Sequence, residues 1–392
     1  MSKQVLIILF SGLVGLAMNI AHPATPAYLR TLTISADMFG IIFASMNLGN
    51  FLMAPVWGNL GDIKNRKYII ATTLFFYGVS QFFFGYFSNI YLIILVRFAA
   101  GFFAAGVISN GLAHISEDPY YETIRKRTIS SFVSFFAIGG AAGYYLGGWV
   151  GTYFVGQESY VLFTQAMVTM LVVVFFLIFV DVPNFNHQNK ARPSFINQIK
   201  QFKTFSKPLM LLILIAVIIS IAHTNFSKYL DLYINDLGYS SKDIGQLVAV
   251  TGLLTLVINW FVVPKMIKHV KATTTLISAV IISAVFSFLT FYLDQTHIYF
   301  YVYTFYLMYI VGKAIYEPTL TYHLSNFDEV SPGMVMGIRQ SAISLGAVIG
   351  PLLGGYLYKD LGVGMFYILS LILVVSAGLL LYYTKLRGEY VD

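Results

Sequence analysis

The 392-residue chain has no cysteine, and only 10% of its residues are charged, against about 25% in an ordinary soluble domain. The absence of cysteine excludes disulfides, iron–sulfur clusters and thiolate zinc sites. The scarcity of charge excludes a soluble protein, because 58% of the residues are hydrophobic and too few polar groups remain to cover an aqueous surface. Lipid must therefore surround much of the chain.

Catalytic and energy-coupling motifs are also missing. The chain has no G-x-x-x-x-G-K-S/T phosphate loop, which argues against nucleotide hydrolysis as a power source. It has no G-x-S-x-G or H-E-x-x-H motif either. We therefore expect no enzyme activity, no cofactor and no metal site.

The hydrophobic residues gather into twelve stretches of about 20 residues, the length that an α-helix needs to cross a bilayer. In hydrocarbon each backbone amide must be hydrogen-bonded within its own helix. We therefore expect an all-α integral membrane protein with twelve transmembrane helices. They are predicted near residues 5–28, 38–60, 68–88, 91–113, 128–154, 160–180, 209–233, 244–263, 273–293, 298–322, 335–357 and 363–384.

Lysine and arginine are distributed unevenly among the connections. Eighteen, Arg339 among them, lie at the two termini and in every second connection, whereas the opposite set holds only Arg30, Lys242 and Lys359. Because cytoplasmic loops carry the excess of basic residues, we expect a multi-pass protein of the inner or plasma membrane with both termini cytoplasmic. The net charge of +7 then reflects topology and contact with anionic membrane lipids, and gives no reason to expect nucleic acid.

The chain divides into two halves that repeat. Ile20-Ala21-His22 recurs as Ile221-Ala222-His223 at an offset of 201 residues, and a run of glycines in the fifth helix recurs in the eleventh at an offset of 207. We predict an N-terminal six-helix bundle at 1–181, a cytoplasmic linker at 182–207 and a C-terminal bundle at 208–392. Such repeats place a substrate site between the halves near the bilayer midplane and allow alternating access. The glycines themselves also suit close helix packing.

Three sequence motifs are recognisable, one in a connection between predicted helices and two within predicted helices. The loop after the second helix reads GNLGDIKNRK from Gly58 to Lys67. The fourth helix holds Arg97 followed by Gly101, Ala104 and Ala105, and the eleventh helix contains Gly350-Pro351 followed by a glycine pair.

These motifs resemble those of the major facilitator superfamily, and the resemblance covers the whole chain. The loop resembles G-x-L-x-D-R-x-G-R-R/K, with Ile63 and Asn65 in place of an arginine and a glycine. The fourth helix resembles R-x-x-x-G-x-x-A-A of proton-coupled members. The eleventh resembles the antiporter motif G-x-x-x-G-P-x-x-G-G, whereas Tyr144 replaces the proline in the fifth. The best match is to the bacterial twelve-helix drug:proton antiporters of the quinolone and multidrug type.

The resemblance implies two pseudo-symmetric six-helix bundles with a cavity lined by helices 1, 4, 7 and 10. It also implies that the loop motif holds one conformational state, with Asp62 as its acidic centre. The residues expected to act in gating are Gly58, Asp62, Arg66, Lys67, Gly139, Gly143, Gly346, Gly350, Pro351 and Gly354.

Polar residues embedded in the predicted helices are the candidates for binding substrate or protons, since an ionisable group within an apolar helix is functional by default. Lys313 and Glu317 share one helix face, as do Lys228 and Asp231, so each pair is either functional or a self-neutralising structural pair. We expect Asp231 within reach of water, and His114 and Glu117 at the membrane interface. The candidates are Asn19, His22, Asn47, Arg97, His223, Lys228, Asp231, Tyr309, Lys313 and Glu317.

Glu317 is the first candidate for the coupling proton, with His22 as an alternative because imidazole titrates near neutrality. We expect a monomeric secondary transporter that exports small amphipathic or drug-like molecules in exchange for protons. A flippase for lipids or glycolipids remains an alternative. A membrane enzyme or a receptor-like sensor is disfavoured, because the chain carries neither an extra soluble domain nor a catalytic constellation.

Overall fold

The computed structural model describes residues 2–183, 205–292, 295–325, 327 and 332–388. Within these ranges the chain forms helices joined by short turns, and no β-strand occurs. Twelve helical segments of the described residues are long and apolar enough to cross a bilayer, which confirms the predicted all-α membrane fold. The predicted linker at 182–207 lies mostly outside the described residues.

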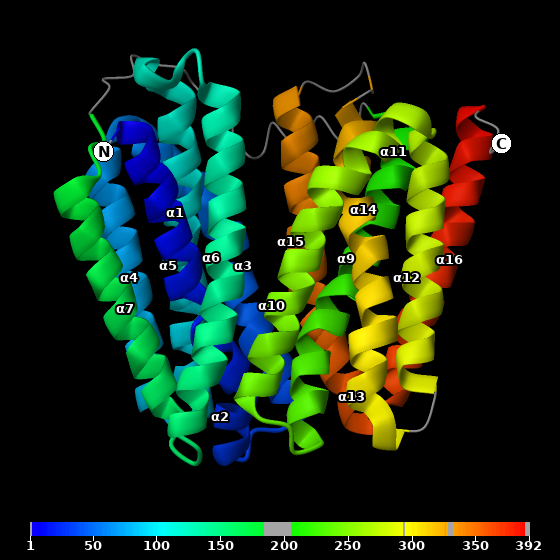
Figure 1. Cartoon of the computed structure of the whole chain (residues 1–392), viewed down its shortest axis with the longest axis horizontal. Helices are drawn as coiled ribbons and strands as arrows, with labels where there is room; N and C mark the ends of the chain where they lie inside the picture. Colours follow the sequence, from blue (N-terminus) through cyan, green and yellow to red (C-terminus); the bar gives the residue numbers. More distant parts are fainter. Residues whose placement is uncertain (1, 184–204, 293–294, 326, 328–331, 389–392) are drawn as a thin grey trace. The chain divides into compact units, whose positions relative to one another are not determined.

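Each predicted hydrophobic stretch coincides with one of these helices (Figure 1). The first six are α1 with α2 (Lys3–Asn19 and Thr25–Thr31), α3 (Ala36–Ile63), α4 (Arg66–Tyr86), α5 (Ile90–Glu117), α6 (Arg125–Tyr153) and α7 (Ser159–Phe179). The other six are α9 (Lys207–Asp236), α10 with α11 (Ser241–Val257 and Val263–His269), α12 (Ala272–Tyr292), α13 with α14 (Ile298–Tyr301 and Leu307–Ser325), α15 (Pro332–Leu361) and α16 (Gly364–Arg387).

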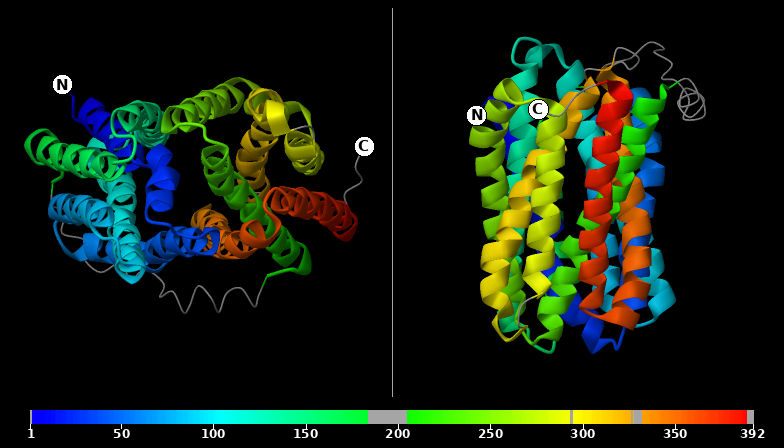
Figure 2. Two further views of the ribbon diagram at one scale, coloured as in Figure 1. Left: turned by 90° about the horizontal axis from the view of Figure 1, so that it is seen from below. Right: turned by 90° about the vertical axis from the view of Figure 1, so that its right-hand side faces the viewer.

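The helices cluster into two compact units. The first comprises Met1–Pro193 and Asp231–Ala249, and the second comprises Ser194–Leu230 and Val250–Asp392. Within the first unit α1 packs against α6, and α5 packs against α3 and α4 (Figure 2). Within the second unit α12 packs against α14 and α16. The division predicted from the sequence at the linker stays a prediction.

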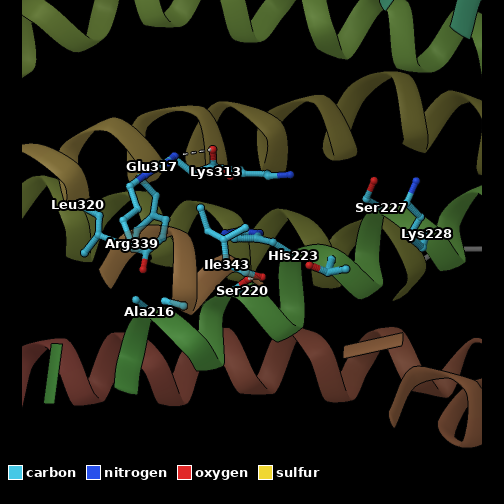
Figure 3. A pocket seen from close by; sticks show the side chains of 13 residues that line it. Ala216, Ser220, His223, Ser227, Lys228, Lys313, Glu317, Leu320, Arg339 and Ile343 are labelled. Atoms are coloured by element: carbon cyan, nitrogen blue, oxygen red, sulfur yellow. Dashed lines mark hydrogen bonds and ion pairs between the residues drawn. The ribbon is translucent and has the colours of Figure 1, made fainter. Parts of the chain in front are cut away.

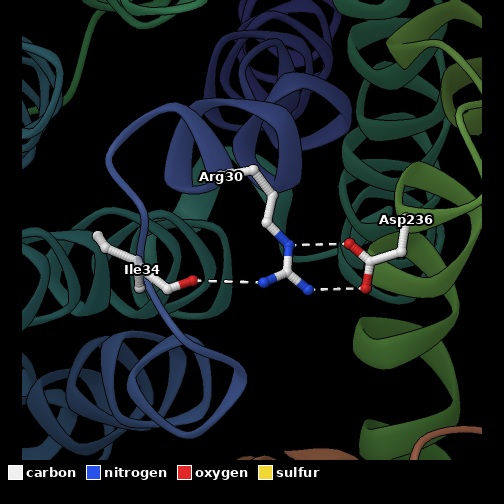
Figure 4. A network of polar contacts seen from close by, with 3 residues as sticks. All are labelled: Arg30, Ile34 and Asp236. Atoms are coloured by element: carbon white, nitrogen blue, oxygen red, sulfur yellow. Dashed lines mark hydrogen bonds and ion pairs between the residues drawn. The ribbon is translucent and has the colours of Figure 1, made fainter.

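The end of α9 clusters with the first unit, and an ion pair joins it to the end of α2 (Figure 4). Arg30, at the end of α2, donates from Nε and Nη2 to the two carboxylate oxygens of Asp236, at 2.8 and 2.7 Å. A third nitrogen of Arg30 donates to the carbonyl of Ile34. This fork geometry is the strong form of an arginine–carboxylate contact and fixes the direction of both side chains.

Prolines and π turns interrupt several spans. Pro23 lies in a 3₁₀ turn, His22–Ala24, and Pro26 lies in the first turn of α2. Proline is tolerated in a first turn because its missing N–H would have no helical partner there. In the eighth span a π turn, Ile258–Val262, joins α10 to α11 directly before Pro264. The helix therefore continues across the proline with one locally widened turn.

The repeated glycines let the same helix pair approach closely in both halves. A Cβ atom at Gly139 of α6 would collide with the carbonyl oxygen of Gly12 in α1, and one at Gly346 of α15 would collide with Ser220 in α9. This geometry supports close packing, and a gating role for these glycines stays a prediction. Gly143 at Leu16, Gly147 at Ile20 and Gly354 at Asn225 are confined in the same way, whereas a Cβ atom at Gly350 would lie 3.1 Å from the carbonyl oxygen of Ile221, which is tight without a collision.

Candidate functional site

A pocket of 230 Å³ lies inside the second unit, walled by α9, α14 and α15 (Figure 3). Its wall combines small and apolar side chains, hydroxyl groups and charged groups. The structure thereby brings together four of the sequence-predicted candidates, His223, Lys228, Lys313 and Glu317. The remaining lining residues are Ala216, Ser220, Thr224, Ser227, Tyr316, Leu320, Arg339, Ala342 and Ile343.

Glu317 forms its ion pair with Arg339 and not with Lys313. The Oε2 atom of Glu317 lies 3.8 Å from Nη2 of Arg339, and the two side chains are 43% and 22% exposed, respectively. In the part of the chain that the structure describes, no ion pair joins Lys313 to Glu317. Figure 3 shows the Lys313 ammonium directed away from the Glu317–Arg339 pair. The interpretation of Lys313 and Glu317 as a self-neutralising pair is therefore wrong.

Arg339 has a role that the sequence did not indicate. The sequence counted it with the basic residues of the cytoplasmic side, at the start of the helix predicted at 335–357. In the structure α15 begins at Pro332, and Arg339 lies about two turns inside the helix. There it lines the pocket and faces Glu317 of α14. Sequence reasoning missed this residue because its position near a predicted helix end was equally consistent with a topological role.

His223 is held at the pocket wall by a tyrosine of α14. Its Nδ1 atom lies 2.7 Å from the hydroxyl of Tyr309, which itself does not line the pocket. Its Nε2 atom and the hydroxyl of Tyr316 are buried and have no hydrogen-bond partner among the described residues. Buried polar atoms are nearly always hydrogen-bonded, so these two atoms are available to a ligand or to water.

Asp231, three residues after Lys228 on α9, is only 6% exposed. The expectation that it lies within reach of water is therefore wrong. Asp231 begins the segment of α9 that clusters with the first unit, whereas Lys228 lines the pocket of the second.

Arg97 lies in the core of the first unit and is 2% exposed. Its guanidinium carbon lies 4.6 Å from the ring centroid of Phe84 and 5.4 Å from that of Phe43. Its Nε and Nη2 atoms have no hydrogen-bond partner among the described residues. Cation–π contacts offset only part of the desolvation of a buried charge, so this arginine is costly to keep and is a strong functional candidate.

A polar cluster in the same unit escaped sequence reasoning. Gln165 of α7 donates from Nε2 to the carbonyl of Met18, at 2.8 Å, and to the hydroxyl of Tyr77, at 3.1 Å. Both amide atoms of buried Gln81 have no hydrogen-bond partner among the described residues. Single amides scattered over apolar helices form no sequence pattern, and only their position in the fold brings them together.

The other first-unit candidates make local contacts. Asn19 donates from Nδ2 to the carbonyl of Gly15, at 2.7 Å, and Asn47 donates to the carbonyl of its own helix four residues earlier, at 3.1 Å. His22 stacks on Tyr144, with the ring centroids 5.5 Å apart. Their roles in binding substrate or protons stay predictions.

The loop motif forms the tight connection between α3 and α4. Asn65, which stands where the family pattern has glycine, caps α4 by accepting a hydrogen bond from the backbone N–H of Lys67, at 2.9 Å. Arg66 is 5% exposed at the start of α4, and Gly58 lies within the last turns of α3. The side chain of Asp62 lies outside the described residues, so its latch role stays a prediction.

Two contacts between a basic and an acidic side chain lie near the ends of the first-unit helices. Nε2 of His114 lies 3.7 Å from Oδ2 of Asp118, and the two side chains are buried, at 1% and 4% exposure. His114 lies in the last turn of α5, and its expected position at the membrane interface stays a prediction. Lys3 lies 2.7 Å from Asp181, and this hydrogen bond lowers the pKa of the Asp181 carboxyl below its usual value.

Among the described residues no group of three or more histidines and acids is arranged to hold a metal.

The sequence pattern that defines the Major Facilitator Superfamily matches residues 7–331. The chain belongs to this superfamily. It is accordingly a multi-pass membrane transporter and not an enzyme.

Among its relatives, the quinolone resistance protein NorA of Staphylococcus aureus (strain MRSA252) is 24% identical over 366 residues, which cover 91% of this chain and 90% of that protein. Multidrug resistance protein 2 of Bacillus subtilis (strain 168) is 22% identical over 399 residues, with coverage of 99% and 97%.

Solved structures of the superfamily share the fold over the full length. A bacterial homolog of the human lysosomal transporter Spinster, in an inward-facing and occupied conformation, gives a TM-score of 0.77 at 13% identity and covers 99% of this chain and 98% of that one. The nucleoside transporter NupG gives a TM-score of 0.74 at 14% identity, with coverage of 100% of both chains. These likenesses confirm the predicted superfamily fold.

Proposed function

We propose that this transporter exports small amphipathic or drug-like molecules in exchange for protons, by alternating access. The observation that carries the proposal is the pocket between α9, α14 and α15, where an acid and several bases face apolar wall residues in the middle of a membrane-spanning bundle. Charged groups inside a membrane bundle mark substrate and proton pathways. The names of the two relatives, a quinolone resistance protein and a multidrug resistance protein, support efflux of drug-like molecules.

Glu317 is the proposed carrier of the coupling proton. It is the only acid among the described residues that line the pocket, and its partner Arg339 is 3.8 Å away. A carboxylate held by so loose a pair can exchange the arginine for a proton without rearranging the helix. Protonation of Glu317 would release Arg339, so proton binding and the charge of the pocket would change together.

Arg97 and the loop motif are proposed to act in the conformational cycle. Arg97 is a buried cation with two nitrogens that lack hydrogen-bond partners among the described residues, which suits a group whose partner arrives in another state. Asp62 is proposed to hold one of the two conformational states of the alternating-access cycle.

We further propose that the protein works as a monomer in the plasma membrane, surrounded by lipid, with both termini cytoplasmic.

The test is transport by purified protein in liposomes with an imposed pH gradient. A panel of fluorescent amphipathic compounds is offered, and protein-free liposomes and liposomes whose gradient is collapsed by an ionophore serve as controls. We expect accumulation of at least one compound that depends on both the protein and the gradient. Gradient-independent movement of fluorescent lipid between leaflets, with no accumulation of soluble compounds, would instead establish a flippase and overturn the proposal.

A further inference from the structure

The charged groups of the second-unit pocket are not balanced. Of the described residues that line it, three are basic (Lys228, Lys313 and Arg339) and one is acidic (Glu317), a formal balance of +2 with histidine neutral. The acid is engaged with Arg339. Lys228 also interacts with a neighbouring group, so the positive charge of the lining that is left for a ligand is that of Lys313.

Lys313 is the centre of this excess. In the described residues its ammonium has neither an ion-pair nor a hydrogen-bond partner. Figure 3 shows it directed along the pocket toward Ser227 and Lys228, on the far side from the Glu317–Arg339 pair. A cation inside a membrane-spanning helix bundle is costly unless an anion pairs with it or water solvates it. A ligand can supply the missing negative charge.

The neighbouring wall offers further polar contacts. The Nε2 atom of His223 and the hydroxyl of Tyr316 are buried and lack hydrogen-bond partners among the described residues. Leu320 and Ile343 supply apolar wall on α14 and α15. One part of the pocket is thus suited to an acidic group and another to a hydrocarbon surface.

We infer that the pocket selects organic anions, with the acidic group of the substrate at Lys313 and an apolar ring or short chain against Leu320 and Ile343. This inference rests on the proposed transport function and names its substrate class. The volume of 230 Å³ is below the range of about 300–1,000 Å³ that is usual for drug-sized ligands. The pocket therefore holds a small anion, or the acidic end of a larger one.

The test compares three probes that share a bicyclic body and differ in charge: 2-naphthoate, 2-naphthylmethanol and 2-naphthylmethylammonium. Binding is measured by calorimetry on the full-length protein in nanodiscs of zwitterionic phosphatidylcholine, so that the lipid supplies no net negative charge. We expect naphthoate to bind most tightly and the ammonium probe least. If the wild-type protein binds naphthoate no more tightly than naphthylmethanol, the inference is overturned, and no substituted protein is needed to show this.

Substitution of Lys313 then locates the site. Lys313→Met should weaken naphthoate binding by about tenfold or more, equivalent to about 1.4 kcal/mol, while alcohol binding is unchanged. Lys313→Arg, which keeps the charge, should retain most of the affinity. Lys268→Met, an exposed lysine of α11 outside the pocket, is the matched control and should behave as wild type. An equal loss of all three probes in Lys313→Met, or no loss of naphthoate, contradicts the assignment.

The outcomes separate this inference from the proposed function. Selective, Lys313-dependent naphthoate binding without proton-driven transport of any compound would leave the anion site standing and remove the proposed function. Proton-driven export of cationic compounds, with no preference for the carboxylate probe, would support the proposed function and remove the anion site.

Discussion

Replacing Glu317 by glutamine separates a proton-carrying acid from a structural ion pair. At the observed 3.8 Å, two unit charges attract by about 1 kcal/mol in water and about 4 kcal/mol at an effective dielectric constant of 20. The carboxylate of Glu317 is 43% exposed to the pocket, which places the pair near the lower value. We therefore expect Glu317→Gln to cost at most about 1 kcal/mol and to lower the melting temperature by no more than a few degrees.

The functional loss should be much larger than the loss of stability. Glutamine keeps the shape of the side chain but cannot bind and release a proton, so transport driven by a pH gradient should be abolished. Substrate binding and downhill exchange should remain measurable. The assay pairs thermal melting with proton-driven uptake in liposomes, and Asp360→Asn, an exposed acid at the end of α15, serves as the control.

A stable Glu317→Gln protein with undiminished proton-driven transport would refute this reasoning. Attention would then pass to His22 and Asp231 as proton carriers. A strongly destabilised protein would show instead that the pair with Arg339 is structural, contrary to its long separation and exposure.

Three further changes test the packing, the ion pair of the first unit and the loop motif. Gly139→Ala should destabilise the protein by about 1–3 kcal/mol, because the added carbon meets the carbonyl of Gly12, whereas Gly378→Ala, which meets nothing within 4 Å, should not destabilise it. Arg30→Gln breaks a two-bond pair between partly exposed side chains and should cost no more than about 1 kcal/mol. Asp62→Asn should slow transport while membrane insertion is retained.

Melting curves in nanodiscs and initial transport rates decide these cases. Equal effects of the two glycine substitutions would contradict the close approach of α1 and α6. A loss of several kcal/mol in Arg30→Gln would show that the pair is more than a partly screened surface contact. Full transport by Asp62→Asn would remove the latch assignment.

The sequence predicted the fold well, because the length and hydrophobicity of a membrane span are local properties of the chain. All twelve stretches were placed within a few residues of a helix. The glycine spacing in both halves also predicted close helix approach, since only a missing side chain allows Gly139 and Gly346 to lie against their neighbours.

The site was predicted less completely, because its contacts cross between helices. The spacing of Lys313 and Glu317 indicated a pair along one helix, yet the acid contacts Arg339 of the following helix. A basic residue near a predicted helix end, such as Arg339, can lie in a loop or line a pocket. The composition of the segment does not distinguish these two positions. Gln81 and Gln165 gave no pattern at all, although they lie in the buried core of the first unit.

Alternating access is the central claim, and the distance between the two units tests it most directly. The chain has no native cysteine, so Lys64→Cys and Lys268→Cys, at exposed positions after α3 and in α11, give one unique pair of spin-label sites. Pulsed electron paramagnetic resonance in nanodiscs would compare the distance distribution without substrate, with substrate and at two pH values. Alternating access predicts populations that shift between a shorter and a longer distance. A single distance that is unchanged under every condition would contradict it.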